Sequence, residues 1–229
     1  MQSHPKEHRI FHYTTSVDYL RDILTDGFWP RFCVEEFDWL LGPSTYIAFP
    51  MVCFCDIPIP AATCHRARYG YYAVAMSKIW AINDLNPVWY IHVGSSIRGH
   101  LEDLLSQTPP ATLNGIPASI KPLLPFLKKT VGSQRDRGPI PHPGELEIVS
   151  FEDELEWRHT PPSLANNWKI GSTREIVTDS DHELSRGHRL IIKHADIDTV
   201  YVQTDAERDS LLTEFATLDG KVMKWQTPS

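Results

Sequence analysis

The chain has 229 residues, of which 41% are hydrophobic and 22% are charged, proportions typical of a globular protein and not of a disordered one. Its formal net charge of −7 argues against binding to nucleic acid or anionic membranes through charge alone. The first residues carry no apolar signal-peptide core, and no later run is long enough to span a bilayer. We therefore expect a cytoplasmic protein with no membrane partner, folded as one domain over residues 1–229.

The N-terminal segment predicts a strand that passes directly into a helix. Residues 9–14 alternate apolar and polar side chains, and Ser16 then begins a run with helical apolar spacing that ends at Gly27. Ser16 is a good N-cap residue, and a helix N-terminus offers free backbone N–H groups to a polar or anionic ligand. His12 and Thr14 would lie beside those groups. The alternative is an ordinary strand–helix joint with polar residues on its surface.

The rest of the chain predicts further strands and helices in alternation. An aromatic segment at 28–41 either packs on the domain or covers a pocket, and packing is the safer interpretation. Apolar or alternating runs predict strands at 46–55, 71–76, 88–93, 145–150, 189–193 and 199–203. Helices are predicted at 61–68, 95–105, 120–129 and 205–212, with a short helical turn after Ser77. The sequence thus predicts a mixed sheet with helices.

Residues 132–144 are rich in glycine and proline and predict a flexible loop. Such a stretch is also typical of a linker between domains. We prefer a surface loop, because the strands on either side resemble parts of one mixed sheet.

A Glu-x-Glu pattern follows this loop. If residues 151–158 are extended, Glu152, Glu154, Glu156 and Arg158 share one face. Two carboxylates on one face can hold a ribose hydroxyl and stabilise a positive charge that develops on a sugar carbon. His12 and Thr14 on a neighbouring strand would then add hydrogen bonds to the same ligand. The alternative is an exposed edge strand whose acids are only solvated.

Cysteine and histidine residues raise a second kind of site. Cys53 and Cys55 would face the same way on a strand, and Cys64 and His65 follow, so a zinc-stabilised module is an alternative. The spacing is poor for zinc, and cysteines in a buried run usually behave as small apolar residues. No metal is therefore expected. No nucleophile elbow or glycine-rich phosphate loop is present, which excludes the common hydrolase and kinase motifs.

Several blocks of the sequence, between about residue 9 and residue 215, resemble the AbiGi family of abortive phage-resistance proteins. The blocks are 11–15, 27–30, 49–58, His65 with Tyr69 and Gly70, 73–76 before Trp80, 86–88 and 154–158. The resemblance implies an antitoxin of a phage-abortive system, with a toxin or antitoxin protein as its partner.

The opening block is also similar to the DarT-like ADP-ribosyltransferases, in which a His-x-Thr strand precedes a helix and a late Glu-x-Glu strand completes an NAD site. That resemblance implies roles for particular residues. The ligand-binding residues would be His12, Tyr13 and Thr14 for nicotinamide and ribose, Arg31 for the diphosphate, and Tyr71 or Tyr72 as an aromatic wall. Glu154 or Glu156 would be the catalytic carboxylate. Here Trp157 and Arg158 follow the acids directly, and the choice between the two glutamates stays open.

Together these resemblances predict an α+β fold of the ADP-ribosyltransferase type, in one domain with a mixed, bent pair of β-sheets and peripheral helices. The first functional hypothesis is a phage-defence protein that binds NAD as substrate and transfers ADP-ribose to a protein or nucleic acid. The alternatives are a non-catalytic antitoxin or binding module and, less favoured, the zinc-stabilised module.

Overall fold

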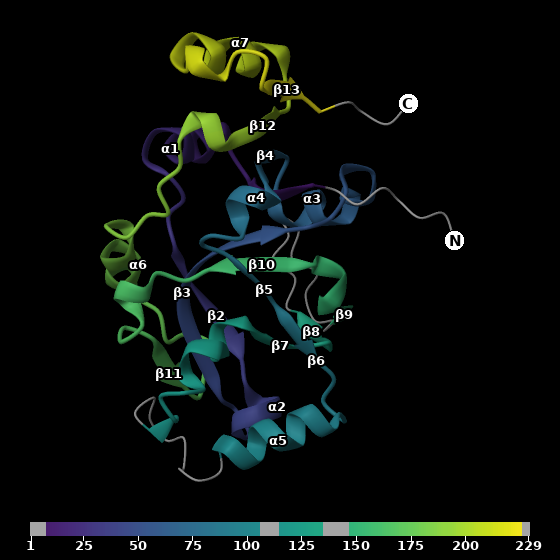
Figure 1. Cartoon of the computed structure of the whole chain (residues 1–229), viewed down its shortest axis with the longest axis vertical. Helices are drawn as coiled ribbons and strands as arrows, with labels where there is room; N and C mark the ends of the chain where they lie inside the picture. Colours follow the sequence, from purple (N-terminus) through teal and green to yellow (C-terminus); the bar gives the residue numbers. More distant parts are fainter. Residues whose placement is uncertain (1–7, 106–114, 135–146, 226–229) are drawn as a thin grey trace.

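The computed structural model describes residues 8–105, 115–134 and 147–225 and has a mixed α+β architecture (Figure 1). Across the main sheet the strands run β13 (Val222–Lys224), β12 (Ile197–Val202), β4 (Tyr72–Ser77), β1 (Arg9–Thr14), β3 (Tyr46–Cys55), β10 (Glu156–His159) and β5 (Asn86–Pro87). Two further strands, β2 (Arg31–Glu36) and β11 (Lys169–Gly171), also pair with β3. Because β12 and β13 are parallel and the other pairs antiparallel, the prediction of a mixed sheet is confirmed.

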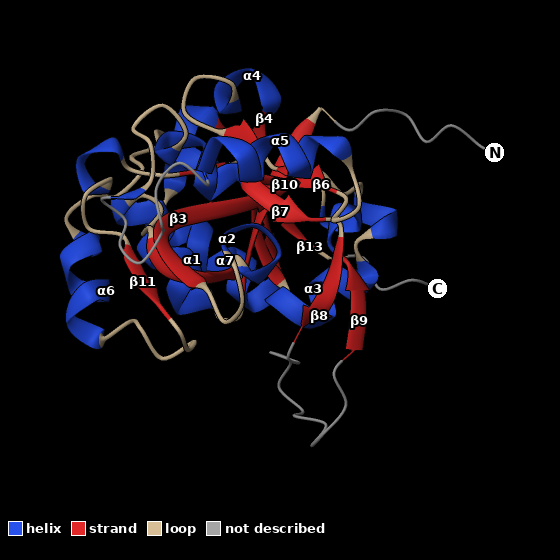
Figure 2. Cartoon of the chain, turned by 90° about the horizontal axis from the view of Figure 1, so that it is seen from below, coloured by secondary structure: helices blue, strands red, loops and turns tan. Residues whose placement is uncertain are grey.

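Smaller elements surround this sheet. Strands β6 (Trp89–Ile91) and β7 (Leu127–Lys129) form one separate pair. Strands β8 (Val131–Gln134) and β9 (Glu147–Ser150) form another, and these two strands lie side by side in Figure 2. The helices are α1 (Val17–Asp26), α2 (Asp38–Leu41), α3 (Thr63–Tyr69), α4 (Lys78–Ala81), α5 (Ser96–Leu105), α6 (Asp179–Arg186) and α7 (Asp205–Glu214). No helix in the described ranges is both long enough and apolar enough to cross a membrane.

The predicted joint between β1 and α1 is confirmed. The Ser16 hydroxyl accepts a hydrogen bond from the Tyr19 backbone N–H at 3.2 Å, which caps α1. Gly27 ends the helix with a φ of +86°, a conformation that favours glycine. A Cβ at this position would lie 2.5 Å from the Leu190 carbonyl oxygen, so Gly27 also allows Phe28 to bridge to Leu190.

Strand β3 joins the two parts of the molecule. Its first half pairs with β2 and β11, and its last four residues pair with β10. With β1 it shares a single residue pair, Phe11 with Cys55. The sheet therefore divides beside β1, where β3 continues along β2.

The two largest buried apolar clusters of the described residues both include residues of β3. One contains Val52 and Phe54 and packs beneath α1 and α7, whereas the other contains Ile47 and Phe49 and packs against α2 and α5. Figure 1 shows α7 at one end of the molecule and α2 with α5 at the other. One continuous strand thus anchors both clusters, as expected for a single folding unit.

Three sequence-based predictions about secondary structure are wrong. The helix predicted at 120–129 is a 3₁₀ helix at Lys121–Phe126 followed by strand β7. Residues 151–158 do not form one strand: Phe151–Glu154 is a 3₁₀ helix, Leu155 is left-handed with a φ of +44°, and only then does β10 begin. Residues 189–193 form no strand either. Their pairing with another backbone segment is limited to the isolated bridge between Leu190 and Phe28.

The structure also adds elements that the sequence analysis left out. Strand β2 lies in the aromatic segment, and α6 lies in a polar stretch that begins with a capping box between Thr178 and Asp181. Of the predicted loop at 132–144, residues 132–134 belong to β8, and the rest lies outside the described residues.

Candidate functional site

A cavity of about 310 Å³ opens where the sheet divides beside β1. Its lining comes from β1, β2, β3, α3, β7 and the segment that leads into β10. Five of the predicted site residues line it, namely His12, Tyr13, Arg31, Glu154 and Glu156. The structure therefore brings most of the predicted residues together, from segments that are far apart in the sequence.

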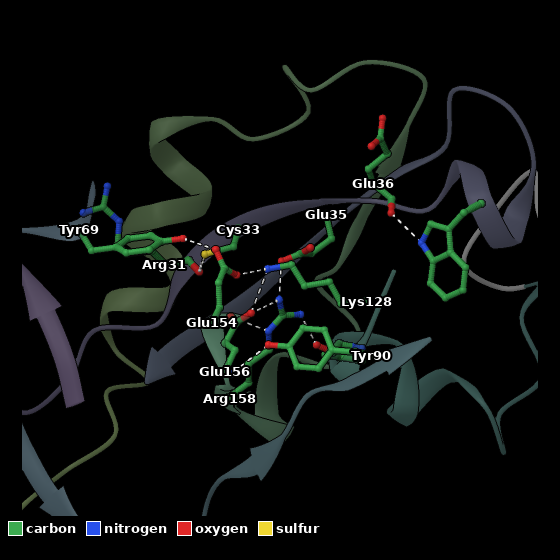
Figure 3. A network of polar contacts seen from close by, with 12 residues as sticks. Arg31, Cys33, Glu35, Glu36, Tyr69, Tyr90, Lys128, Glu154, Glu156 and Arg158 are labelled. Atoms are coloured by element: carbon green, nitrogen blue, oxygen red, sulfur yellow. Dashed lines mark hydrogen bonds and ion pairs between the residues drawn. The ribbon is translucent and has the colours of Figure 1, made fainter. Parts of the chain in front are cut away.

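The centre of the cavity wall is an alternating chain of charges (Figure 3). The Lys128 ammonium contacts Glu154 at 2.8 Å and Glu156 at 3.1 Å. Arg158 donates two hydrogen bonds to Glu156, at 2.8 and 2.9 Å, and one to Glu35 at 2.7 Å. Each carboxylate thus has a cationic neighbour, which is the condition for burying charge without a large cost.

Burial and charge act in opposite directions on this network. Burial by itself raises the pKa of the Glu156 carboxyl, but the adjacent Arg158 and Lys128 outweigh it and hold that pKa well below its usual range. For Lys128, burial lowers the pKa of the ammonium, while the Glu156 and Glu35 carboxylates bring it well above its usual range. Glu156, Lys128 and Arg158 are therefore all charged near neutral pH.

Glu154 and Glu156 both contact Lys128, but they do not lie on one continuous strand as predicted. Glu154 ends the 3₁₀ helix, and the left-handed Leu155 reverses the local direction before Glu156 enters β10. A leucine at positive φ is uncommon, because its Cβ meets the backbone there. Its side chain is 47% exposed, so both acids turn toward the cavity while Leu155 faces solvent.

The two glutamates differ in how firmly they are held. Glu156 accepts hydrogen bonds from Nε and Nη2 of Arg158 as well as from Lys128, and Arg158 is fully buried. Glu154 accepts from the Tyr69 hydroxyl at 2.9 Å and from Lys128, with Arg68 3.8 Å away. Glu154 therefore accepts fewer hydrogen bonds from cationic side chains than Glu156, and its carboxylate is held less firmly.

His12 lies on β1 and also lines the cavity. Its Nδ1 is 2.9 Å from the Cys53 carbonyl oxygen, which can only accept, so Nδ1 carries the proton. Burial lowers the pKa of the His12 imidazole, which keeps the ring neutral. Nε2 then presents a lone pair and has no hydrogen-bond partner within the described part of the chain.

Aromatic residues that the sequence analysis did not assign to the site form one wall. The ring of His65 lies 5.1 Å from that of Tyr13 and 4.4 Å from that of Tyr69. Burial, assisted by Arg68, lowers the pKa of His65 to about 4, so this ring is also neutral. The sequence signal for His65 and Tyr69 was their place in the blocks that resemble AbiGi proteins.

Three predicted ligand-binding residues lie outside the cavity lining. Thr14 is buried at the end of β1, where Gly70 packs on its carbonyl group. The Tyr72 hydroxyl donates to Glu207 at 2.6 Å, and the backbone oxygen of Tyr71 accepts from the Trp225 indole. The chain turns at Gly70 so that Tyr69, not Tyr71 or Tyr72, supplies the aromatic wall.

The cysteines do not assemble a metal site in the described ranges. All four are free thiols, and no group of three or more His, Cys, Asp or Glu side chains there has a geometry suited to a metal ion. Cys53 and Cys55 line the cavity instead. Burial raises the pKa of the Cys55 thiol to about 12, so it is a neutral part of the wall.

Known proteins point to one family. Residues 28–203 match the family described as "Putative abortive phage resistance protein AbiGi, antitoxin". The chain is also 28% identical over 224 residues to the abortive phage resistance protein AbiGi of Lactococcus lactis subsp. cremoris, covering 82% of this chain and 86% of the relative. No solved structure matches the chain. Because the family match spans well over half of the sequence, this protein belongs to the AbiGi family of abortive phage-resistance proteins.

Proposed function

We propose that this AbiGi protein binds NAD in the cavity beside β1 and transfers ADP-ribose to a macromolecular acceptor during phage defence. The observation that supports the proposal best is the convergence of His12, Arg31 and Glu154 on one cavity at the division of the sheet. These residues come from β1, β2 and the segment before β10. They offer a neutral hydrogen-bonding ring, a cation and a carboxylate, which suit a base or amide, a diphosphate and a ribose.

Glu154 is our choice for the carboxylate that contacts the reacting ribose. In the proposed step the bond between nicotinamide and the ribose C1′ breaks, and its electron pair leaves with nicotinamide. The acceptor nucleophile then bonds to C1′ and gives up its proton. A carboxylate about 4 Å from the developing positive charge stabilises it by roughly 4 kcal/mol at an effective dielectric constant near 20. Glu154 suits this role because Arg158 does not bind it.

Glu156 then acts as a positioning residue. Its two bonds from Arg158 fix the carboxylate, and the carboxylate in turn holds Lys128 at 3.1 Å, next to Glu154. Its charge is already compensated, so it contributes little to a new positive centre. This division of roles selects between the two glutamates that the sequence left equivalent.

A second function, that of a non-catalytic antitoxin, has its own supporting observation. Lys128 and Arg158 together neutralise both carboxylates of the site, as in a purely structural ion network. The family description also includes the word antitoxin. In this reading the AbiGi fold binds a toxin protein, and the cavity need not bind NAD.

The two functions are separated by incubating the purified full chain with NAD labelled in its adenylate part, together with candidate proteins and nucleic acids. Wild type should bind NAD and transfer label, and Glu154→Gln should lower transfer strongly while leaving NAD bound. Glu156→Gln should weaken both. Glu214→Gln, an exposed change on α7, is the matched control. Absence of NAD binding and of transfer by wild type sinks the enzymatic proposal, and capture of the product of an adjacent gene supports the antitoxin one.

A further inference from the structure

Three arginines in or beside the cavity lie on aromatic rings. The guanidinium carbon of Arg31 lies 4.1 Å from the centre of the Trp29 ring, and that of Arg186 lies 4.6 Å from the same ring. Arg174 lies 5.4 Å from the ring of Tyr46. Of these residues, Arg31, Arg174 and Trp29 line the cavity.

Hydrogen bonds hold this arrangement in place. The Trp29 indole N–H donates to Ser185 Oγ at 3.1 Å and to the His182 carbonyl at 3.2 Å, which fixes the ring against α6. His182 Nδ1 accepts from Arg31 Nε at 3.4 Å and from the Phe32 backbone N–H at 3.3 Å. Arg31 therefore uses Nε for orientation, and neither of its Nη nitrogens has a hydrogen-bond partner among the residues that the structure describes.

Other arginines of this acidic protein contact carboxylates. Arg158, Arg189 and Arg208 each form an ion pair of 2.9 Å or shorter with a carboxylate. Arg31 and Arg174, by contrast, have no carboxylate within ion-pair distance among the residues that the structure describes. Arg186 has only an exposed pair with Glu183 at 3.5 Å, of a kind that contributes little.

Arg31 and Arg174 thus lie on aromatic rings in one cavity, with no carboxylate at ion-pair distance among the described residues, although the chain has a net charge of −7. Such cations indicate an anionic ligand. We propose that Arg31 and Arg174, supported by Arg186 beside them on the Trp29 ring, form a phosphate-binding subsite of the cavity, which takes the diphosphate of a small nucleotide. The inference rests on the proposed function only for the identity of that nucleotide. A nucleic-acid backbone has the same phosphate chemistry, but the cavity position of Arg31 and Arg174 favours a compact ligand.

The test is calorimetric titration of the full chain with inorganic pyrophosphate, ADP-ribose and a single-stranded oligonucleotide. We expect pyrophosphate and ADP-ribose to bind, and Arg31→Gln and Arg174→Gln each to weaken both ligands about 10-fold or more, the usual effect of losing a charge-assisted hydrogen bond. Arg186→Gln should weaken them less, because this side chain is half exposed. Arg208→Gln, an arginine paired on α7, is the matched control and should change nothing.

Several results overturn the inference. They are no binding of either phosphate ligand by wild type, equal binding by the Arg31 and Arg174 variants, and tighter binding of the oligonucleotide than of ADP-ribose. Thermal unfolding of each variant checks that it is folded, and Arg31→Lys replaces Arg31→Gln if the latter is not. Lysine keeps the positive charge but lacks the planar guanidinium, so Arg31→Lys should bind the phosphate ligands with an affinity between those of wild type and Arg31→Gln. Phosphate binding without label transfer would refute ADP-ribosylation and leave the subsite intact, so the two proposals fail separately.

Discussion

Removal of Arg158 is the sharpest test of the ion network. This side chain is fully buried and donates to Glu156, Glu35 and the Pro125 carbonyl. In Arg158→Met the apolar stem is kept, but Glu156 stays buried with Lys128 as its remaining cation. Breaking a buried pair from one side typically costs about 3–5 kcal/mol, a large share of the roughly 5–15 kcal/mol that stabilises a domain.

Urea unfolding at neutral pH, followed by tryptophan fluorescence, measures this loss. The double variant Arg158→Met with Glu156→Gln should recover part of it, with a coupling energy of about 1–3 kcal/mol, because the glutamate is then no longer a charge without its main partner. Arg208→Met, on the exposed face of α7, should stay within about 0.5 kcal/mol of wild type. A loss below about 1 kcal/mol for Arg158→Met, or strict additivity in the double variant, would refute the reasoning.

Three other predictions follow from the same structure. Because folding lowers the pKa of Glu156, the ionised Glu156 carboxylate stabilises the protein above its ordinary pKa near 4.5, and this stabilisation is lost as the pH falls toward the folded-state pKa. In urea unfolding between about pH 5 and pH 3, the stability of Glu156→Gln should therefore decline less steeply than that of wild type. Gly27→Ala should destabilise the protein by about 1–3 kcal/mol in thermal or urea unfolding, since its Cβ would meet the Leu190 carbonyl at positive φ, and a neutral effect would contradict the geometry. Tyr69→Phe removes a hydrogen bond to Glu154 and should cost about 0.5–1.5 kcal/mol of stability while lowering label transfer, whereas unchanged transfer would separate Tyr69 from the site.

The parts of the fold with strong local signals were predictable from the sequence. The cap at Ser16, the apolar spacing after it and the stop at Gly27 placed α1 correctly, because each depends on residues within one or two turns. The strand at 46–55 was equally clear as a long apolar run, and the structure places it at those residues.

Other parts depend on contacts that no local pattern records. Alternation through residues 151–158 predicted a strand, but the left-handed Leu155 interrupts it. The run at 189–193 has strand composition, yet it finds no partner strand beyond the bridge to Phe28. Lys128 was expected in a short helix, and its role between Glu154 and Glu156 arises only when β7 approaches β10 in the fold.

The candidate site was half predictable for the same reason. His12, Arg31 and the two glutamates were chosen from motif shape, and the cavity contains them all. The sequence placed Arg158 beside the glutamates and His65 in an AbiGi-like block, but their contacts with Glu156 and Tyr13 depend on pairing across the sheet. The placement of Tyr71 and Tyr72 depended on Gly70, which ends α3 at a φ of +119°, and no local sequence pattern predicts which of the neighbouring tyrosines then faces the cavity.

The late position of β10 in the sequence has a consequence for biosynthesis. Strand β3 ends at Cys55, but its partner β10 begins a hundred residues later, at Glu156. A nascent chain that has emerged only as far as β7 lacks Arg158 and the two glutamates that contact Lys128. Such long-range pairing is slow and comes late in folding. The proposed site therefore cannot assemble on a partly synthesised chain, so translation sets the earliest moment at which the ion network can form.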